Sequence, residues 1–253
     1  MLFFKRILDI RKPPAISTER RVATRFAVSR QFPLQTMLNI AGRDEHGQLL
    51  KPKGGEGWDW PGRLVDLSVT GARLQVPLTV IVQRDDTGRL RFDLQGHKFE
   101  VPCRIAHISD RRDYALFGLE LNLTAAGTYS AYRQLLDLVA LGSSLKLVKP
   151  LARDKSGYLL EQYAGEPASR LSVWRLRADK TIAAFEFQLK DCFVRGLAEN
   201  DDLECFVGAD AAKGRAVKPA QSEEINRLYQ WVVLNLASTV PADVRAFLLR
   251  HAI

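Results

Sequence analysis

Three arginines lie within six positions near the start of the chain, at Arg20, Arg21 and Arg25. A planar guanidinium can fork onto phosphate oxygens, pair bidentately with guanine O6 and N7, or stack on a purine face. Arg21 and Arg25 are four positions apart on a polar segment, so they could close around a compact anion from two sides. The same spacing also occurs in solvated basic segments, so the pair alone does not establish a site.

A second polar motif reads Asp66-Leu-Ser68-Val-Thr-Gly71. Asp66 and Ser68 alternate along a predicted strand, so we expect both side chains on the same face. The Asp66 carboxylate is suited to accept from the N1–H and N2–H₂ edge of guanine, and the Ser68 hydroxyl can donate or accept. Gly71 permits a tight turn with positive φ and the close approach of a ligand. An ordinary β-turn with a polar entry explains this motif alone, but both motifs in this order around a first strand are rarer.

The segment between 32 and 123 is typical of a small β-barrel. Short runs rich in Val, Ile, Leu and Phe predict six strands, at 32–40, 63–68, 72–77, 89–95, 98–109 and 114–123. Turn residues separate most of these runs, which indicates tight antiparallel connections and a closed or nearly closed barrel. The exception is 41–62, rich in Gly and charge, which we predict to be a long loop.

A helix is predicted after the barrel, because apolar residues recur at helical spacing from Tyr129 to Val139. A second β-rich stretch and two closing helices follow. The predicted fold class is α+β: a six-stranded antiparallel barrel, a helix, and a second domain of antiparallel strands with two C-terminal helices. The predicted division is an N-terminal tail at 1–19, a barrel domain with a switch arm at 20–124, a connecting helix at 125–146 and a C-terminal domain at 147–253.

With both motifs in place, residues 20–140 resemble the PilZ domain family. That family carries RxxxR before the first strand and [D/N]xSxxG between the second and third strands of a six-stranded antiparallel barrel. Residues 114–121 are similar to its last barrel strand, and a helix directly after the barrel is usual. The segment 41–62 makes the gap between the motifs longer than the family leads us to expect.

The resemblance implies that the protein is a bacterial, cytoplasmic receptor for cyclic di-GMP. By the family pattern Arg21 and Arg25 hold the phosphates and guanine edges, Asp66 and Ser68 read a guanine, and Gly71 shapes the turn. Binding is expected to rearrange the domains or the polar arm at 11–31, which carries Arg21 and Arg25. The signal then passes to a protein partner, contacted through 147–253. Cyclic di-GMP is then the ligand, and no cofactor is expected.

Arg20 precedes the first motif arginine. In the family, an arginine at this place accompanies uptake of the ligand as a stacked dimer, so Arg20 is a further predicted ligand-binding residue. Whether one or two nucleotides bind per chain stays open at this point.

Composition and charge limit the rival functions. Hydrophobic residues make up 46% and charged residues 26% of the chain, as in soluble globular proteins, and the formal charge of +8 favours anionic partners. The three cysteines are far apart in sequence, which argues against a disulfide framework or zinc site and fits a reducing cytosol. Lys5, Arg6 and Asp9 interrupt the apolar N-terminus, and no run approaches the length of a membrane helix, so neither a leader nor a transmembrane segment is expected.

The alternatives to a receptor are an enzyme, a ligand-independent adaptor and a nucleic-acid-binding protein. An enzyme needs a nucleophile with a base or a carboxylate pair, and the sequence offers no such set, so no catalytic residue is predicted. A PilZ adaptor that binds proteins without ligand usually lacks motif residues, whereas this chain keeps them all. Nucleic-acid binding fits the charge, but aromatic and basic residues do not interleave on the strands as a stacking platform requires.

Overall fold

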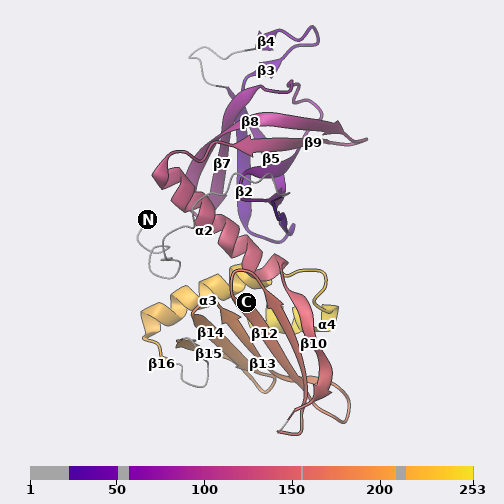
Figure 1. Ribbon diagram of the computed structural model, residues 1–253, viewed down its shortest axis with the longest axis vertical. Helices are drawn as coiled ribbons and strands as arrows, with labels where there is room; N and C mark the ends of the chain where they lie inside the picture. Colours follow the sequence, from indigo (N-terminus) through magenta and orange to yellow (C-terminus); the bar gives the residue numbers. More distant parts are fainter. Residues whose placement is uncertain (1–22, 51–56, 155, 209–214, 253) are drawn as a thin grey trace. The chain divides into compact units, whose positions relative to one another are not determined.

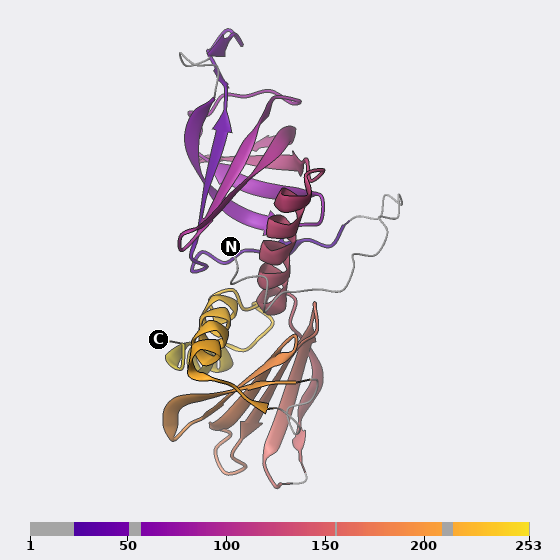
Figure 2. The ribbon, with the colours of Figure 1, turned by 90° about the vertical axis from the view of Figure 1, so that its left-hand side faces the viewer.

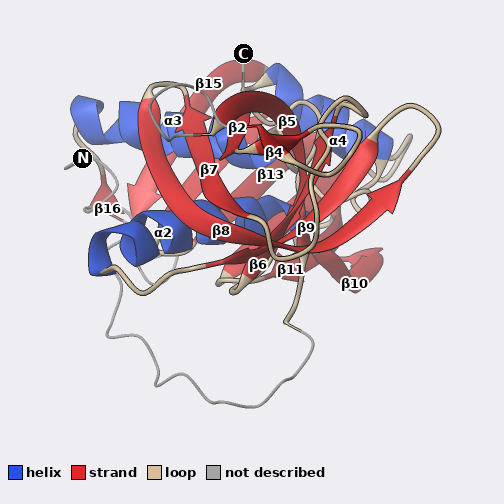
Figure 3. Cartoon of the chain, turned by 90° about the horizontal axis from the view of Figure 1, so that it is seen from above, coloured by secondary structure: helices blue, strands red, loops and turns tan. Residues whose placement is uncertain are grey.

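The computed structural model describes residues 23–50, 57–154, 156–208 and 215–252. Strands dominate this part of the chain, as Figure 3 shows, and its three helices are α2 (Ala126–Ser143), α3 (Pro219–Val233) and α4 (Ala242–Arg250). The chain divides into two compact units inside α2, between Leu136 and Asp137; the short segment Ser29–Phe32 groups with the second unit. The domain boundaries drawn from the sequence stay a prediction.

The first unit contains the predicted closed barrel of six antiparallel strands, to which the structure adds one strand that was not predicted (Figure 1). The barrel order is β5-β2-β7-β8-β9-β6, and β6 returns to pair with β5. The bounds are β2 (Leu34–Ile40), β5 (Trp58–Leu67), β6 (Gly71–Val76), β7 (Thr87–Leu94), β8 (His97–Asp110) and β9 (Ala115–Leu121). The extra strand β1 (Phe26–Ala27) pairs with the end of β5.

Alternation of apolar and polar residues builds the interior of the barrel. In β6, Ala72, Leu74 and Val76 are buried, while Arg73 between them is exposed. Fully buried large side chains fill the centre, among them Leu38, Ile40, Leu67, Leu74, Leu90, Phe92 and Phe117. Burial of each such side chain is worth about 1.5–3 kcal/mol. The core thus fixes the orientation of each strand. Outward positions such as 73 remain free to carry polar side chains that contact solvent or a ligand.

The prediction that 41–62 is a long loop is wrong in two places. Residues 58–62 are the first half of β5 and pair with β2, from Thr36 opposite Gly62 to Ile40 opposite Trp58. A small hairpin, β3 (Gly42–Arg43) with β4 (Leu49–Leu50), occupies the earlier part. Pro61 and the nearby glycines are typical of loops, so the sequence pattern did not indicate a strand here. A proline is tolerated there because, among the described strands, this half of β5 pairs only with β2.

The second unit is a seven-stranded antiparallel sheet whose strands are neighbours in sequence order, with α3 over one face (Figure 2). On that face the Phe185 ring stacks on Tyr229 of α3 at 5.7 Å and meets Phe247 of α4 edge-on at 6.0 Å. The predicted second domain of strands with two C-terminal helices is confirmed. The bounds are β10 (Lys146–Arg153), β11 (Leu159–Gly165), β12 (Ser169–Arg175), β13 (Ile182–Leu189), β14 (Cys192–Leu197), β15 (Asn200–Val207) and β16 (Arg215–Ala216).

Candidate functional site

Asp66 lies where three strands meet, at the seam that closes the barrel. Its Cα partners are Ala27 of β1 on one side and Arg73 of β6 on the other. The pairing of β5 with β6 shifts register between Leu64 and Asp66, a bulge of the kind that re-aims a side chain. The Asp66 side chain is only 5% exposed, so its carboxylate needs hydrogen-bond partners within the protein.

Two guanidinium groups bind the Asp66 carboxylate. Nη1 of Arg25 donates to Oδ1 at 2.7 Å. Arg73 donates to Oδ2 through Nε at 2.7 Å and also through Nη2. The arginine side chains are 47% and 48% exposed, so each guanidinium still faces solvent. Two cations around one anion leave an excess of positive charge at the surface, which suits an anionic ligand.

The turn after Asp66 is closed by Ser68 and Gly71. The Ser68 amide and hydroxyl both donate to the Gly71 carbonyl, at 2.8 and 3.2 Å. Ser68 is 2% exposed. Its hydroxyl proton is used in the hydrogen bond within the turn, but the hydroxyl oxygen can still accept a hydrogen bond. Tyr132 of α2 supports this turn, because its hydroxyl donates to the Ser68 carbonyl at 2.6 Å. Burial raises the pKa of Tyr132, which keeps the phenol protonated as a donor.

Residues 19–140 match the family model of the PilZ domain. These residues are a PilZ domain. No curated protein matches the chain. Among solved structures, it is similar to the PilZ domain with c-di-GMP of YcgR from Escherichia coli, at 12% identity and a TM-score of 0.34, over 47% of this chain and 89% of that one.

Two further solved structures are similar to this chain at comparable sequence identity and TM-score. The complex of MrkH from K. pneumonia with c-di-GMP has 16% identity and a TM-score of 0.34, over 48% of this chain and 53% of that one. The PlzA protein of Borreliella burgdorferi in complex with c-di-GMP has 13% identity and a TM-score of 0.30, over 81% of this chain and 93% of that one.

The PilZ domain brings some of the predicted site residues together and leaves others untested. Arg25 and Asp66 are in direct contact, and Ser68 and Gly71 form the adjoining turn. Arg20 and Arg21 lie outside the described residues. The roles assigned to all six from the family pattern stay predictions.

Sequence reasoning missed Arg73, Tyr132 and β1. A signal for Arg73 was present, because a hairpin that turns at Val69 and Thr70 places position 73 opposite 66. Tyr132 was predicted only as part of an apolar helix face, and its hydroxyl contact depends on how α2 packs. β1 has two residues, which is too short for any alternation to be read.

The positive φ predicted for Gly71 is wrong. The described glycines with positive φ are Gly47, Gly96 and Gly157. Gly71 is needed for space instead, because a Cβ at this position would lie 2.6 Å from the carbonyl oxygen of Leu119 on β9. A backbone atom cannot swing aside as a side chain can, so strands β6 and β9 would have to separate.

Gly71→Ala is therefore expected to lower the free energy of unfolding by about 1–3 kcal/mol, the usual cost of overpacking. Gly127→Ala is the matched control, since a Cβ there meets nothing within 4 Å. It lies in helix α2, where alanine is favoured over glycine by up to about 1 kcal/mol, so this variant should be neutral or more stable. Urea unfolding of both variants is the measurement. Equal midpoints would contradict the packing account of Gly71.

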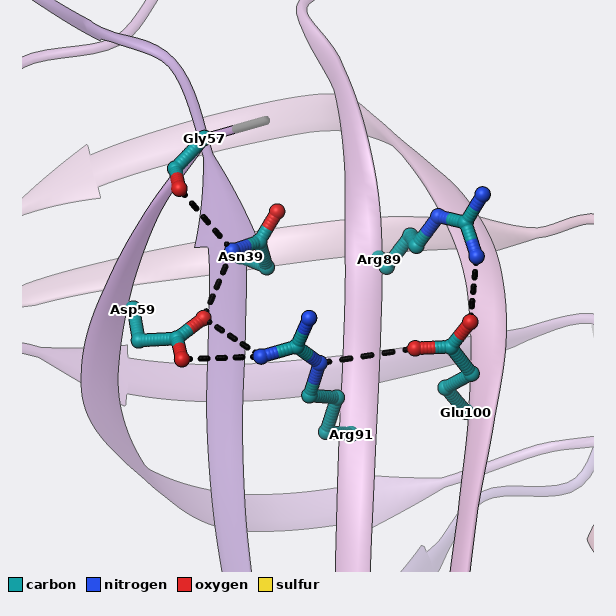
Figure 4. Close-up of polar contacts among 6 residues, drawn as sticks. All are labelled: Asn39, Gly57, Asp59, Arg89, Arg91 and Glu100. Atoms are coloured by element: carbon teal, nitrogen blue, oxygen red, sulfur yellow. Dashed lines mark hydrogen bonds and ion pairs between the residues drawn. The ribbon is translucent and has the colours of Figure 1, made fainter. Parts of the chain in front are cut away.

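A second polar cluster lies on the outer surface of the barrel, across β5, β2, β7 and β8 (Figure 4). Arg91 donates to both carboxylate oxygens of Asp59 at 2.8 Å, and its Nε lies 3.4 Å from Glu100, which Arg89 also contacts. Asn39 donates to Asp59 at 2.6 Å. Two acids balance two arginines here, so this cluster lacks the positive excess found around Asp66. It ties neighbouring strands together and is a weaker candidate for binding an anion.

Two buried cysteine thiols are poor candidates for a nucleophile. Burial raises the pKa of both Cys103 and Cys192 to about 12, so these thiols are neutral at pH 7 and poor nucleophiles. In the described part of the chain, no group of three or more His, Cys, Asp or Glu side chains could hold a metal ion. None of the described helices has the length and apolarity to cross a membrane.

Proposed function

We propose that this protein is a receptor for cyclic di-GMP, with its ligand site at the seam formed by Arg25, Asp66 and Arg73. One observation carries the proposal: Arg25 of the first motif forms an ion pair with Asp66 of the second, 41 positions later, at 2.7 Å. Residues that belong to two separate sequence motifs thus meet at one point of a PilZ domain. PilZ domains act as receptors for this dinucleotide, and we propose no catalytic role.

The chemistry of the seam matches such a ligand. Its two phosphates need cations, and the half-exposed guanidinium groups supply them. Its guanines need an acceptor for N1–H and N2–H₂, and the Asp66 carboxylate supplies that. Arg25 lies beside a strand of only two residues, so it can leave Oδ1 for a phosphate at small cost and open the carboxylate to a base. By the family pattern, Arg20 and Arg21 contribute further cations.

We also propose that the segment after Arg25 carries the signal toward the C-terminal half. The Ser29 amide donates to Oδ1 of Asn235 at 2.7 Å. Asn235 is 1% exposed and also donates to the Val139 carbonyl at 3.0 Å, so this anchor is buried and rigid. Arg25 is four residues before Ser29, so any movement of Arg25 occurs close along the chain to this anchor. Rearrangement of the segment after Arg25 then alters the surface that residues 147–253 present to a protein partner.

Titration calorimetry with cyclic di-GMP tests the receptor proposal. We expect micromolar or tighter binding, about −8 kcal/mol or better, with a stoichiometry of one or two nucleotides per chain. If a stacked dimer binds, Arg20→Leu should reduce two toward one while binding persists. GMP carries one base and one phosphate and should bind far more weakly. Absence of heat with cyclic di-GMP, for protein with a cooperative unfolding transition, would contradict the proposal and favour a ligand-independent adaptor.

A further inference from the structure

We infer that Arg73 reads the O6 atom of a guanine whose N1–H and N2–H₂ groups are bound by Asp66, and so sets the preference for guanine over adenine. The inference rests on the proposed function and names a residue outside both sequence motifs. Arg73 qualifies because it shares the Asp66 carboxylate with Arg25 while remaining half exposed.

Arg73 is the fixed member of the arginine pair. Its backbone lies in β6 between two partners, Asp66 of β5 and Gly118 of β9, so both edges of the strand are held at this position. Arg25, by contrast, precedes a strand of two residues that pairs with β5 alone among the described strands. A ligand that reaches the carboxylate therefore displaces Arg25 more readily and meets Arg73 in place.

The hydrogen-bonding capacity of the pair fits the edge of guanine. A carboxylate offers about four acceptor sites on two oxygens. Arg25 uses Oδ1 through one N–H, and Arg73 uses Oδ2 through Nε and Nη2. Once Arg25 moves to a phosphate, both acceptor sites of Oδ1 are open to the two adjacent guanine donors. Within the described residues, the Nη1 group of Arg73 makes no hydrogen bond, so it can donate to a further acceptor.

The order of groups along the base makes this arrangement selective. Guanine presents O6, N1–H and N2–H₂ side by side, an acceptor followed by two donors. A carboxylate beside a guanidinium, an acceptor beside a donor, complements that order. Adenine presents an amino donor where guanine has O6, and its N1 carries no proton. Adenine also lacks the 2-amino group. Against adenine, Arg73 would face a donor and Asp66 would lose both of its donors, so both protein groups would be left poorly paired.

The neighbouring residues supply a matched control. Two pairs further along the same strands, Arg63 donates through Nε at 3.0 Å and Nη2 at 2.7 Å to the neutral amide oxygen of Gln75. Arg63 lies on the same pair of strands as Asp66 and Arg73. Arg63→Ala removes the same charge from the same part of the sheet without touching Asp66, so it measures the general electrostatic effect.

The test is to measure dissociation constants for cyclic di-GMP, cyclic di-IMP and cyclic di-AMP, by competition where binding is weak. Cyclic di-IMP keeps O6 and N1–H but lacks the 2-amino group. For Arg73→Ala we expect about 10- to 100-fold weaker binding of both O6-bearing ligands, the loss typical of a missing base contact. Binding of cyclic di-AMP should stay unchanged, so the guanine preference should fall by the same factor. Arg63→Ala should leave all three constants nearly unchanged.

Several outcomes would overturn the inference. An equal loss for all three ligands would make Arg73 a phosphate contact, and tighter binding would make it a competitor for Asp66. Unchanged constants would leave it no role in recognition. Arg73→Gln, which keeps most of the side chain, serves if the alanine variant unfolds, and the same loss is expected for it. If the wild-type protein binds no cyclic di-GMP, the receptor proposal fails and this inference with it. If it binds but Arg73 variants keep their selectivity, this inference alone fails.

Discussion

Arg25→Ala is expected to weaken cyclic di-GMP binding by about 30- to 4,000-fold, or about 2–5 kcal/mol, the range for truncating one side of a desolvated charge pair. The expectation follows from the position of Arg25 at the Asp66 carboxylate, where its guanidinium can exchange one anion for another. An alanine removes the phosphate contact and leaves the ligand charge partly unpaired. Titration calorimetry of the variant is the measurement.

The fold should survive this substitution. Arg73 continues to bind Oδ2 of Asp66, so the buried carboxylate keeps a partner. Because Arg25 is about half exposed, loss of its ion pair should cost about 1 kcal/mol of stability or less. Arg30→Ala is the matched control: Arg30 is an exposed arginine five positions further on, and its loss should change affinity little. Equal affinity losses for the two variants would show that general charge, and not the Asp66 contact, drives binding.

The second large effect is expected in the C-terminal unit, at Arg175. This side chain is 10% exposed and donates through Nε to Glu161 at 2.8 Å. Its Nη1 donates to Asp243 of α4 at 2.6 Å and to the Lys180 carbonyl at 3.1 Å. Tyr163 donates to the other oxygen of Glu161 at 3.1 Å. The guanidinium therefore compensates a buried carboxylate and joins the sheet to the last helix.

Arg175→Met is expected to lower the free energy of unfolding by about 3–5 kcal/mol, because Glu161 is left buried without its cation. Asp243→Asn is the matched control. It weakens the other end of the same arginine, where the Asp243 side chain is 56% exposed, and should cost about 1 kcal/mol or less. Adding Glu161→Leu to Arg175→Met should restore much of the loss, since no unpaired charge remains.

Urea unfolding followed by circular dichroism measures these changes. Equal costs for Arg175→Met and Asp243→Asn would mean that Glu161 does not depend on the arginine. Failure of Glu161→Leu to recover stability would assign the loss to packing of the arginine stem. Either result would change the account of how α4 is held to the sheet.

Sequence patterns alone were enough to predict the barrel strand at 32–40, the barrel strands after residue 62, the helix that follows them and the class of the second unit. Alternation, turn residues and helical spacing are local signals, and each element here obeys them. The hairpin around Val69 and Thr70 was readable for the same reason. Its short turn dictates which residues face each other, so the pairing of Asp66 with Arg73 was within reach of the sequence.

The remaining features depend on contacts between distant parts of the chain. The strand at 58–62 lacks an apolar pattern and contains Pro61, and it exists because β2 pairs with it. Gly71 is required by the Leu119 carbonyl of another strand, not by its own backbone angle. The contact of Arg25 with Asp66 joins positions far apart in the chain, and a two-residue strand holds it in register. Such contacts depend on barrel closure, which brings together residues whose own neighbourhoods carry no sign of one another.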